Sequence, residues 1–198
     1  MIKNRGLSRA FGLLALTAIC LAACTATPLP STPSPMGDTI NFDDLSVDTV
    51  YHVNDTFTSV KATLSVLSFY WSDKTSYNDG SATVIAAEKT GNTGNEIMLN
   101  NVNLGFDVGS LECITIRFFK SGGNVNLIIN QVEGNFNEFQ DTNVGGVDVS
   151  VAYDSNTNYK GTLTLRGKFE KFVFQEKWSI SFAIGGQELW LDDIGPCR

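Results

Sequence analysis

The sequence predicts an all-β protein in which an export segment and a tether precede a single antiparallel β-sandwich. Three observations support this prediction. Hydrophobic and polar residues alternate along most of the chain beyond residue 39, which is the period of a strand with one buried face. Clusters of Gly, Asn, Asp and Ser separate these runs. No window of about a dozen residues shows convincing helical spacing.

Residues 1–23 have the composition of a secretory signal. A basic head precedes the apolar run 11–23, and no acidic residue occurs before Asp38. The run is too short to span a bilayer comfortably. Its end, Leu21-Ala22-Ala23-Cys24, resembles the lipobox of bacterial lipoproteins, in which the cysteine becomes the first mature residue and carries lipids. The alternative is an ordinary signal peptide with a cysteine there by chance.

The lipobox resemblance implies that Cys24 anchors the protein to a membrane, on the side facing away from the cytoplasm. In that family an Asp after the cysteine favours retention at the inner membrane, so Thr25 leaves the cell membrane and the outer membrane both open. Residues 24–38 hold four of the five prolines and predict an extended tether. Residues 39–198 then form the sandwich domain, which is long enough for one core.

The strands of this domain follow from period-two runs. SATVIAAEK could hold a helical turn, but Thr83, Val84 and Ile85 favour a strand. The runs ECITIRFF and NVNLIIN, separated by Ser121–Gly123, predict two further strands. Three runs each place four hydrophobic residues on one face, namely Val102, Leu104, Phe106 and Val108; Val147, Val149, Val151 and Tyr153; and Trp178, Ile180, Phe182 and Ile184.

The cysteines predict one disulfide in the mature chain. Cys20 leaves with the signal and Cys24 takes the lipids, so Cys113 and Cys197 remain. An exported protein meets an oxidising environment, which favours pairing of these two residues. A free, inert Cys113 within a strand is the alternative.

Two Asp-Asp pairs, in INFDDL and ELWLDDI, lie in the first and last predicted strands. Many sandwiches place these strands side by side, which would bring Asp43, Asp44, Asp192 and Asp193 together. Converging carboxylates repel one another unless a cation lies between them, and Ca²⁺ prefers oxygen ligands. The sequence therefore predicts a structural calcium site at these four residues. The alternative is that the pairs are solvated turn residues.

The pattern INFDDL, GGNVNLIIN, GGVDVSV, GTLTLRG and IGGQELWLDDI resembles jelly-roll domains related to carbohydrate-binding modules, the galactose-binding-like sandwiches. The similarity extends over most of residues 39–194. It implies a jelly-roll-like fold and carbohydrate binding, with a structural calcium held by acids near the first strand and an acid on the last. The early Gly-Glu or Gly-Gln of that family is missing here.

Two groups of residues are candidates for binding a sugar. Exposed aromatic rings offer apolar area, and amides on an open sheet face bond hydroxyls. Tyr70 is expected to be the exposed ring of the Phe-Tyr-Trp run. The alternatives are a half-buried aromatic and a solvated outer face. The complete candidate set is Tyr70, Trp71, Tyr77, Asn124, Asn126 and Asn130.

Charge and motifs argue against nucleic-acid binding and catalysis. Without residues 1–23 the chain has 11 Lys and Arg against 21 Asp and Glu, a formal net charge of −10, which repels nucleic acid. His52 is the only histidine, and GxSxG, phosphate-loop and paired-carboxylate patterns are missing. We therefore expect a non-catalytic binding domain, or alternatively a structural or adhesion module of the envelope that contacts another protein. Its oligomeric state stays open.

Overall fold

The computed structural model describes residues 36–155 and 157–198, and strands are the only regular elements in that part of the chain. The predicted signal peptide, Cys24 and residues 25–35 of the tether lie outside the described residues. Nothing in the described ranges forms a helix that is long and apolar enough to cross a membrane.

The described residues form fifteen strands: β1 (Val50–His52), β2 (Thr56–Ser59), β3 (Ala62–Tyr70), β4 (Ser76–Tyr77), β5 (Ser81–Ala86), β6 (Asn95–Asn100), β7 (Val102–Phe106), β8 (Cys113–Ile129), β9 (Val132–Phe136), β10 (Thr142–Val144), β11 (Val147–Tyr153), β12 (Lys160–Arg166), β13 (Phe172–Phe174), β14 (Trp178–Ile180) and β15 (Phe182–Pro196). Thirteen of them belong to one antiparallel sheet, and β13 and β14 pair only with each other.

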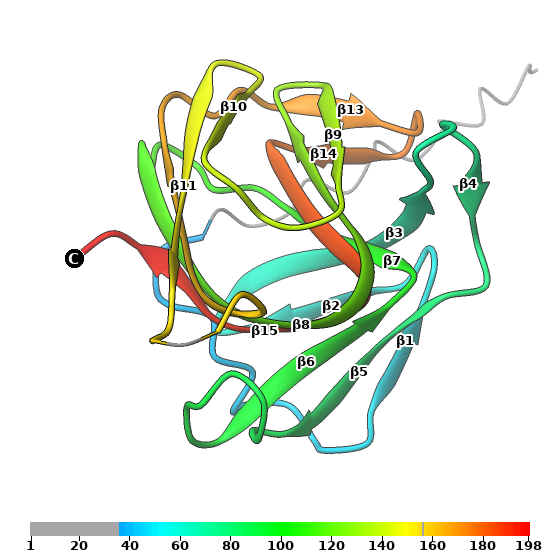
Figure 1. Ribbon diagram of the computed structural model, residues 1–198. Coiled ribbons are helices and arrows are strands. Elements are labelled where there is room, and N and C mark those ends of the chain that lie inside the picture. The colour runs from blue at the N-terminus through cyan, green and yellow to red at the C-terminus, as the bar shows by residue number, and fades with distance from the viewer. Residues whose placement is uncertain (1–35, 156) are drawn as a thin grey trace, which may run out of the picture.

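Two long strands shape this sheet. β8 and β15 pair from Phe182 opposite Ile129 to Pro196 opposite Ile114, and both curve through the molecule (Figure 1). Register shifts between Gly186 and Leu189 and after Asp192 interrupt their ladder, and such bulges bend strands. The curved sheet therefore supplies both layers of the sandwich, and the predicted all-β antiparallel fold is confirmed.

The predicted break at Ser121–Gly123 is wrong, because β8 runs through it without interruption. Gly123 has a φ of 66°, and a Cβ there would lie 2.3 Å from Oε1 of Gln187. The glycine therefore allows a bend against β15 at a position where a larger residue would collide. A glycine pair that resembles a turn in the sequence is here the bend of a single strand.

Two hydrophobic cores stabilise the layers. The main core contains the predicted rows of β7 and β11. A smaller core lies on the opposite sheet face, where the β13–β14 hairpin covers Leu67, Ile128 and Ala183. Trp178 and Ile180 belong to this smaller core, whereas residues 182 and 184 belong to the main one. The prediction of one shared face for residues 178–184 is wrong, because the chain leaves the hairpin at Ser181.

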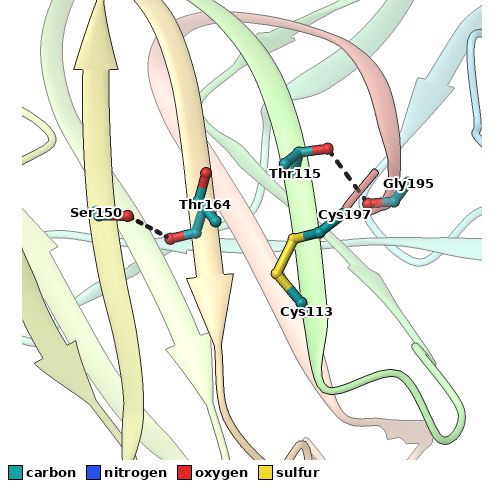
Figure 2. Close-up of a disulfide and its surroundings, with 6 residues drawn as sticks. All are labelled: Cys113, Thr115, Ser150, Thr164, Gly195 and Cys197. Atoms are coloured by element: carbon teal, nitrogen blue, oxygen red, sulfur yellow. Dashed lines mark hydrogen bonds between the residues drawn. A yellow bond between two sulfur atoms is a disulfide. The ribbon is translucent and has the colours of Figure 1, made fainter.

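The first described segment lies beside the last strand. Ile40 and Ile194 exchange two backbone hydrogen bonds of 2.8 and 2.9 Å. Close by, the disulfide joins Cys113 at the start of β8 to Cys197 after β15, with Cα atoms 5.4 Å apart (Figure 2). This agrees with the predicted pairing. Closing a loop of 84 residues stabilises the fold by about 4.6 kcal/mol at most.

Candidate functional site

The four predicted calcium ligands have different partners. The Asp44 carboxylate accepts hydrogen bonds from Ser59 Oγ at 2.7 Å and from the Val60 backbone N–H at 2.9 Å. Val60 and Lys61 form the two-residue turn between β2 and β3, and both have positive φ values. Residues other than glycine and asparagine rarely adopt this backbone conformation. Asp44 therefore stabilises a strained turn.

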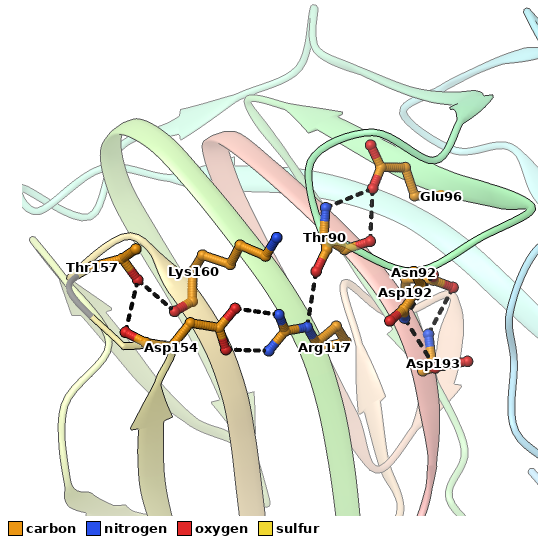
Figure 3. A network of polar contacts seen from close by, with 9 residues as sticks. All are labelled: Thr90, Asn92, Glu96, Arg117, Asp154, Thr157, Lys160, Asp192 and Asp193. Atoms are coloured by element: carbon orange, nitrogen blue, oxygen red, sulfur yellow. Dashed lines mark hydrogen bonds and ion pairs between the residues drawn. The ribbon is translucent and has the colours of Figure 1, made fainter.

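The other three aspartates contact the segment 92–95 that leads into β6. Asp43 accepts the backbone N–H of Asn95 at 2.7 Å. Asn92 Nδ2 donates to both Asp192 and Asp193 at 2.9 Å (Figure 3). The Asp193 N–H also donates to Asp192 Oδ1 at 2.8 Å. Asp43 and the Asp192–Asp193 pair thus hold neighbouring parts of one loop.

This arrangement does not resemble a cage of four carboxylates around one cation. Each of the four is bonded to an amide or hydroxyl donor. Within residues 36–155 and 157–198, no group of three or more His, Cys, Asp or Glu is arranged to hold a metal ion. Calcium binding stays a prediction of the sequence, and none of the roles assigned to these aspartates depends on it.

A buried carboxylate organises the same loop. Glu96 on β6 is fully buried and accepts the backbone N–H groups of Glu88, Lys89 and Thr90 at 2.9–3.2 Å, together with Thr90 Oγ1 at 2.8 Å. The Thr90 carbonyl accepts Arg117 Nε at 2.9 Å (Figure 3). Four donors therefore compensate the cost of burying this carboxylate.

Arg117 extends this network across the sheet. Its guanidinium group forms a bidentate ion pair with Asp154, and this bond lowers the pKa of the Asp154 carboxyl. We call the set of residues 88–96, Arg117, Asp154, Asp192 and Asp193 the acidic loop network. Glu96 and Arg117 bond backbone groups, Arg117 pairs with Asp154, and Asp192 and Asp193 share the Asn92 amide, which is the arrangement of a structural element.

Asp192 is the residue of this network whose pKa is raised. It is 1% exposed. Burial raises its pKa from 3.8 to about 6, although the hydrogen bonds from Asn92 and from the Asp193 backbone oppose this shift. The charges of Asp193 and Glu96 raise the pKa further.

A polar groove lies where β8 and β9 meet the residues that follow β3. Its volume is about 630 Å³, within the size range of small-molecule sites. Amides dominate the lining, which consists of Ser72, Asn124, Asn135, Phe136, Asn137, Glu138 and Gln140. We call it the amide groove. Each amide can both donate and accept hydrogen bonds, as a hydroxyl-bearing ligand requires.

The three predicted asparagines have three different environments. Asn124 lines the amide groove. Asn126 is 2% exposed, so the expectation that it lies on an open face is wrong; the β13–β14 hairpin packs against Ile128 on that face, and Asn135 on the neighbouring strand β9 bonds the Asn126 amide. Asn130 lies in the β8–β9 turn, with a φ of 51°, and bonds the backbone of Gly145, Lys168 and Glu170.

The predicted aromatic residues lie outside the groove lining. The Tyr70 ring is half-buried against Phe174, with centroids 5.9 Å apart, and its hydroxyl accepts Gln175 Nε2 at 3.0 Å. The expectation that Tyr70 is the exposed ring is therefore wrong. Trp71 and Tyr77 are half-buried and contact each other edge to face at 6.2 Å. Trp71 adjoins Ser72 in the sequence, and Ser72 does line the groove.

The sequence patterns did not identify the groove residues contributed by β9 and the following loop. Asn135, Phe136 and Asn137 are adjacent in GNFNEFQ, a short run rich in amides around an aromatic ring, and this composition was the available signal. Gly134 leaves room for the ring, because a Cβ there would lie 2.5 Å from Phe136 Cε2. The glycine thus determines where Phe136 lies.

No family model matches this chain, and searches of curated proteins and of solved structures find no match either.

Proposed function

We propose that this protein is a lipid-anchored, extracytoplasmic β-sandwich that binds carbohydrate without catalysis, and that the amide groove is its binding site. One observation carries the proposal. The groove combines four amide side chains, a hydroxyl and an aromatic ring in about 630 Å³. Amides bond sugar hydroxyls and an aromatic ring covers the apolar face of a sugar. The resemblance to carbohydrate-binding modules supports the same ligand class.

Glycan-array binding of the full chain, followed by titration of the best ligand, tests the proposal. Replacing Asn124 by Ala removes one amide from the groove, and we expect about a tenfold loss of affinity from the lost hydrogen bonds. Asn158→Ala is the matched control, because Asn158 is exposed in the segment between β11 and β12. Equal affinity of both variants and the parent protein would remove the groove from the proposal.

The proposed anchor depends on the lipobox resemblance of Cys24. We expect Cys24→Ser to move the protein from the membrane fraction to the soluble fraction of the producing cell, because the acylated residue is lost. Mass spectrometry of the N-terminal peptide should then also lose the lipid mass. A Cys24→Ser protein that stays membrane-bound would contradict a lipid anchor at this residue.

A second candidate is a module that contacts another protein through a sheet edge. β1 ends the pairing order of the large sheet and pairs with β5 alone. Val47 and Val50, beside this edge, are 45% and 46% exposed. Exposed edges can accept a further strand. Protease-resistant complex formation that Val50→Lys abolishes, without any glycan binding, would favour this function.

A further inference from the structure

A row of polar side chains crosses the sheet behind the amide groove. Asn103 on β7 is opposite Gly185 on β15, Gly185 is opposite Asn126 on β8, and Asn126 is opposite Asn135 on β9. Directly paired residues of antiparallel strands lie on the same sheet face. The row therefore runs from the interior of the sheet to the groove, where Asn135 and its neighbour Asn124 form part of the lining.

The backbone determines how these amides are oriented. Asn103 Nδ2 donates to the Ser68 carbonyl at 2.6 Å, and Asn135 Nδ2 donates to the Tyr70 carbonyl at 2.9 Å. A carbonyl only accepts hydrogen bonds, so the atoms facing it must be nitrogens. The usual ambiguity between the oxygen and nitrogen of an amide is thus removed at both positions.

The remaining amides are then oriented in one direction. Asn135 Nδ2 donates to Asn126 Oδ1 at 2.7 Å, and Asn124 Nδ2 donates to Asn135 Oδ1 at 2.6 Å. Both hydrogens of Asn135 Nδ2 are used, so its Oδ1 is the end that Asn124 meets. Asn124 Oδ1 accepts no hydrogen bond from any described residue. This oxygen is the end of the row that is left for a ligand.

The interior end of the row holds one unbonded donor and one unbonded acceptor. Asn126 Nδ2 and Asn103 Oδ1 are both buried and without a bonding partner among the described residues. They flank Gly185, where a Cβ would lie 2.0 Å from Asn103 Oδ1. A donor and an acceptor therefore face each other across a residue that has no side chain. Asn126 and Asn135 each present their oxygen to the neighbouring asparagine nearer the groove, Asn135 and Asn124 respectively.

We infer that these asparagines form a relay that makes the amide groove selective for uncharged ligands whose hydroxyls donate hydrogen bonds. Asn126 and Asn135 act as positioning residues for Asn124. The outward Oδ1 of Asn124 accepts, and Glu138, the only ionisable side chain in the lining, supplies a carboxylate that accepts and repels anions. Neutral hexoses satisfy both groups, whereas uronic acids place a negative charge beside them. This inference rests on the proposed function and specifies its ligand class.

One arm of the test needs no ligand. Hydrogen exchange of side-chain amides is followed by NMR on the full chain. The two Asn135 Nδ2 protons should exchange about tenfold more slowly than those of exposed Asn137, because each Asn135 proton is hydrogen-bonded. Asn126→Leu removes one partner without touching the groove lining and should accelerate one of the two protons. Asn158→Ala should leave both unchanged. Exchange at Asn135 as fast as at Asn137 would overturn the relay.

The second arm compares glucose-, galactose- and mannose-terminated oligosaccharides with their uronic acid counterparts. We expect at least about tenfold tighter binding of the neutral forms. Glu138→Gln should reduce this preference, and Asn126→Leu should weaken neutral binding several-fold although it lies outside the groove. Equal binding of uronic acids by the parent protein would overturn the selectivity. If neither form binds while Asn135 stays protected, the proposed function and the selectivity fail and only the relay orientation survives.

Discussion

The acidic loop network and the amide groove both place polar groups against one sheet, but they differ in what is left unbonded. In the acidic loop network, Glu96 accepts four hydrogen bonds and Arg117 bonds both Asp154 and the Thr90 carbonyl. In the groove, Asn124 keeps a free oxygen and its supporting row keeps a buried donor and acceptor. Saturated polar groups hold a fold together, whereas unsaturated ones beside a groove can recognise a ligand.

Glu96→Ala should have the largest effect on the acidic loop network. The substitution leaves three backbone N–H groups and the Thr90 hydroxyl without their acceptor, and we expect a loss of about 4 kcal/mol in the free energy of unfolding. Urea denaturation measures this loss. Glu88→Ala is the control, since Glu88 contributes only its backbone N–H to the network. A loss below about 1 kcal/mol would show that this network is not a major source of stability.

The pH dependence of stability tests Asp192. Its pKa is about 6 in the folded protein against an ordinary 3.8, so the folded state binds the proton more tightly than the unfolded state. The free energy of unfolding should therefore fall by about 2–3 kcal/mol as the pH rises from about 4 to 6, and no further above that. Asp192→Asn has one side-chain oxygen, so it can keep only one of the hydrogen bonds from Asn92 Nδ2 and the Asp193 N–H, but it does not titrate and should remove this slope. If the variant keeps the same slope, the pH dependence of the free energy of unfolding comes from other groups.

Calcium is expected to act at Asp192 and Asp193 of the acidic loop network and at Asp43 and Asp44, but not at the amide groove. If Asp43, Asp44, Asp192 and Asp193 contribute to a calcium site as the sequence predicts, Ca²⁺ at ten times its dissociation constant stabilises the fold by about 1.4 kcal/mol. The melting temperature should then rise by about 3–6 °C and fall again with EGTA. If the melting temperature does not shift and elemental analysis finds no bound metal, the calcium prediction is wrong. Binding at the amide groove should not respond.

The smallest expected effect concerns Gly134. Alanine there meets the Phe136 ring, a movable side chain, at 2.5 Å, so stability should change by about 1 kcal/mol or less. The displaced ring should nevertheless weaken ligand binding about five- to tenfold, or about 1 kcal/mol. Isothermal titration beside urea denaturation separates the two effects. Gly37→Ala, where a Cβ meets nothing within 4 Å, should alter neither property.

The sequence predicted the secondary structure far better than the binding surface. Alternation assigned Val102, Leu104 and Phe106 to the core, and the spare cysteines indicated the disulfide. Alternation also separated Asn126 from Val125 and Leu127, but it could not show that the β13–β14 hairpin packs on the second face, where Ile128 lies. Whether the face opposite the core is open depends on segments that arrive from elsewhere in the chain.

By itself the sequence determined that this chain forms antiparallel strands around a hydrophobic core, because a period of two places alternate residues on opposite faces whatever the topology. It also predicted the pairing of Cys113 with Cys197, which the structure contains. Which polar residues are saturated depends on the tertiary structure. Glu96 meets its donors within one loop of the chain. Asn124 takes its orientation from Asn135, which in turn bonds the Tyr70 carbonyl, because the pairing of strands brings these distant residues together.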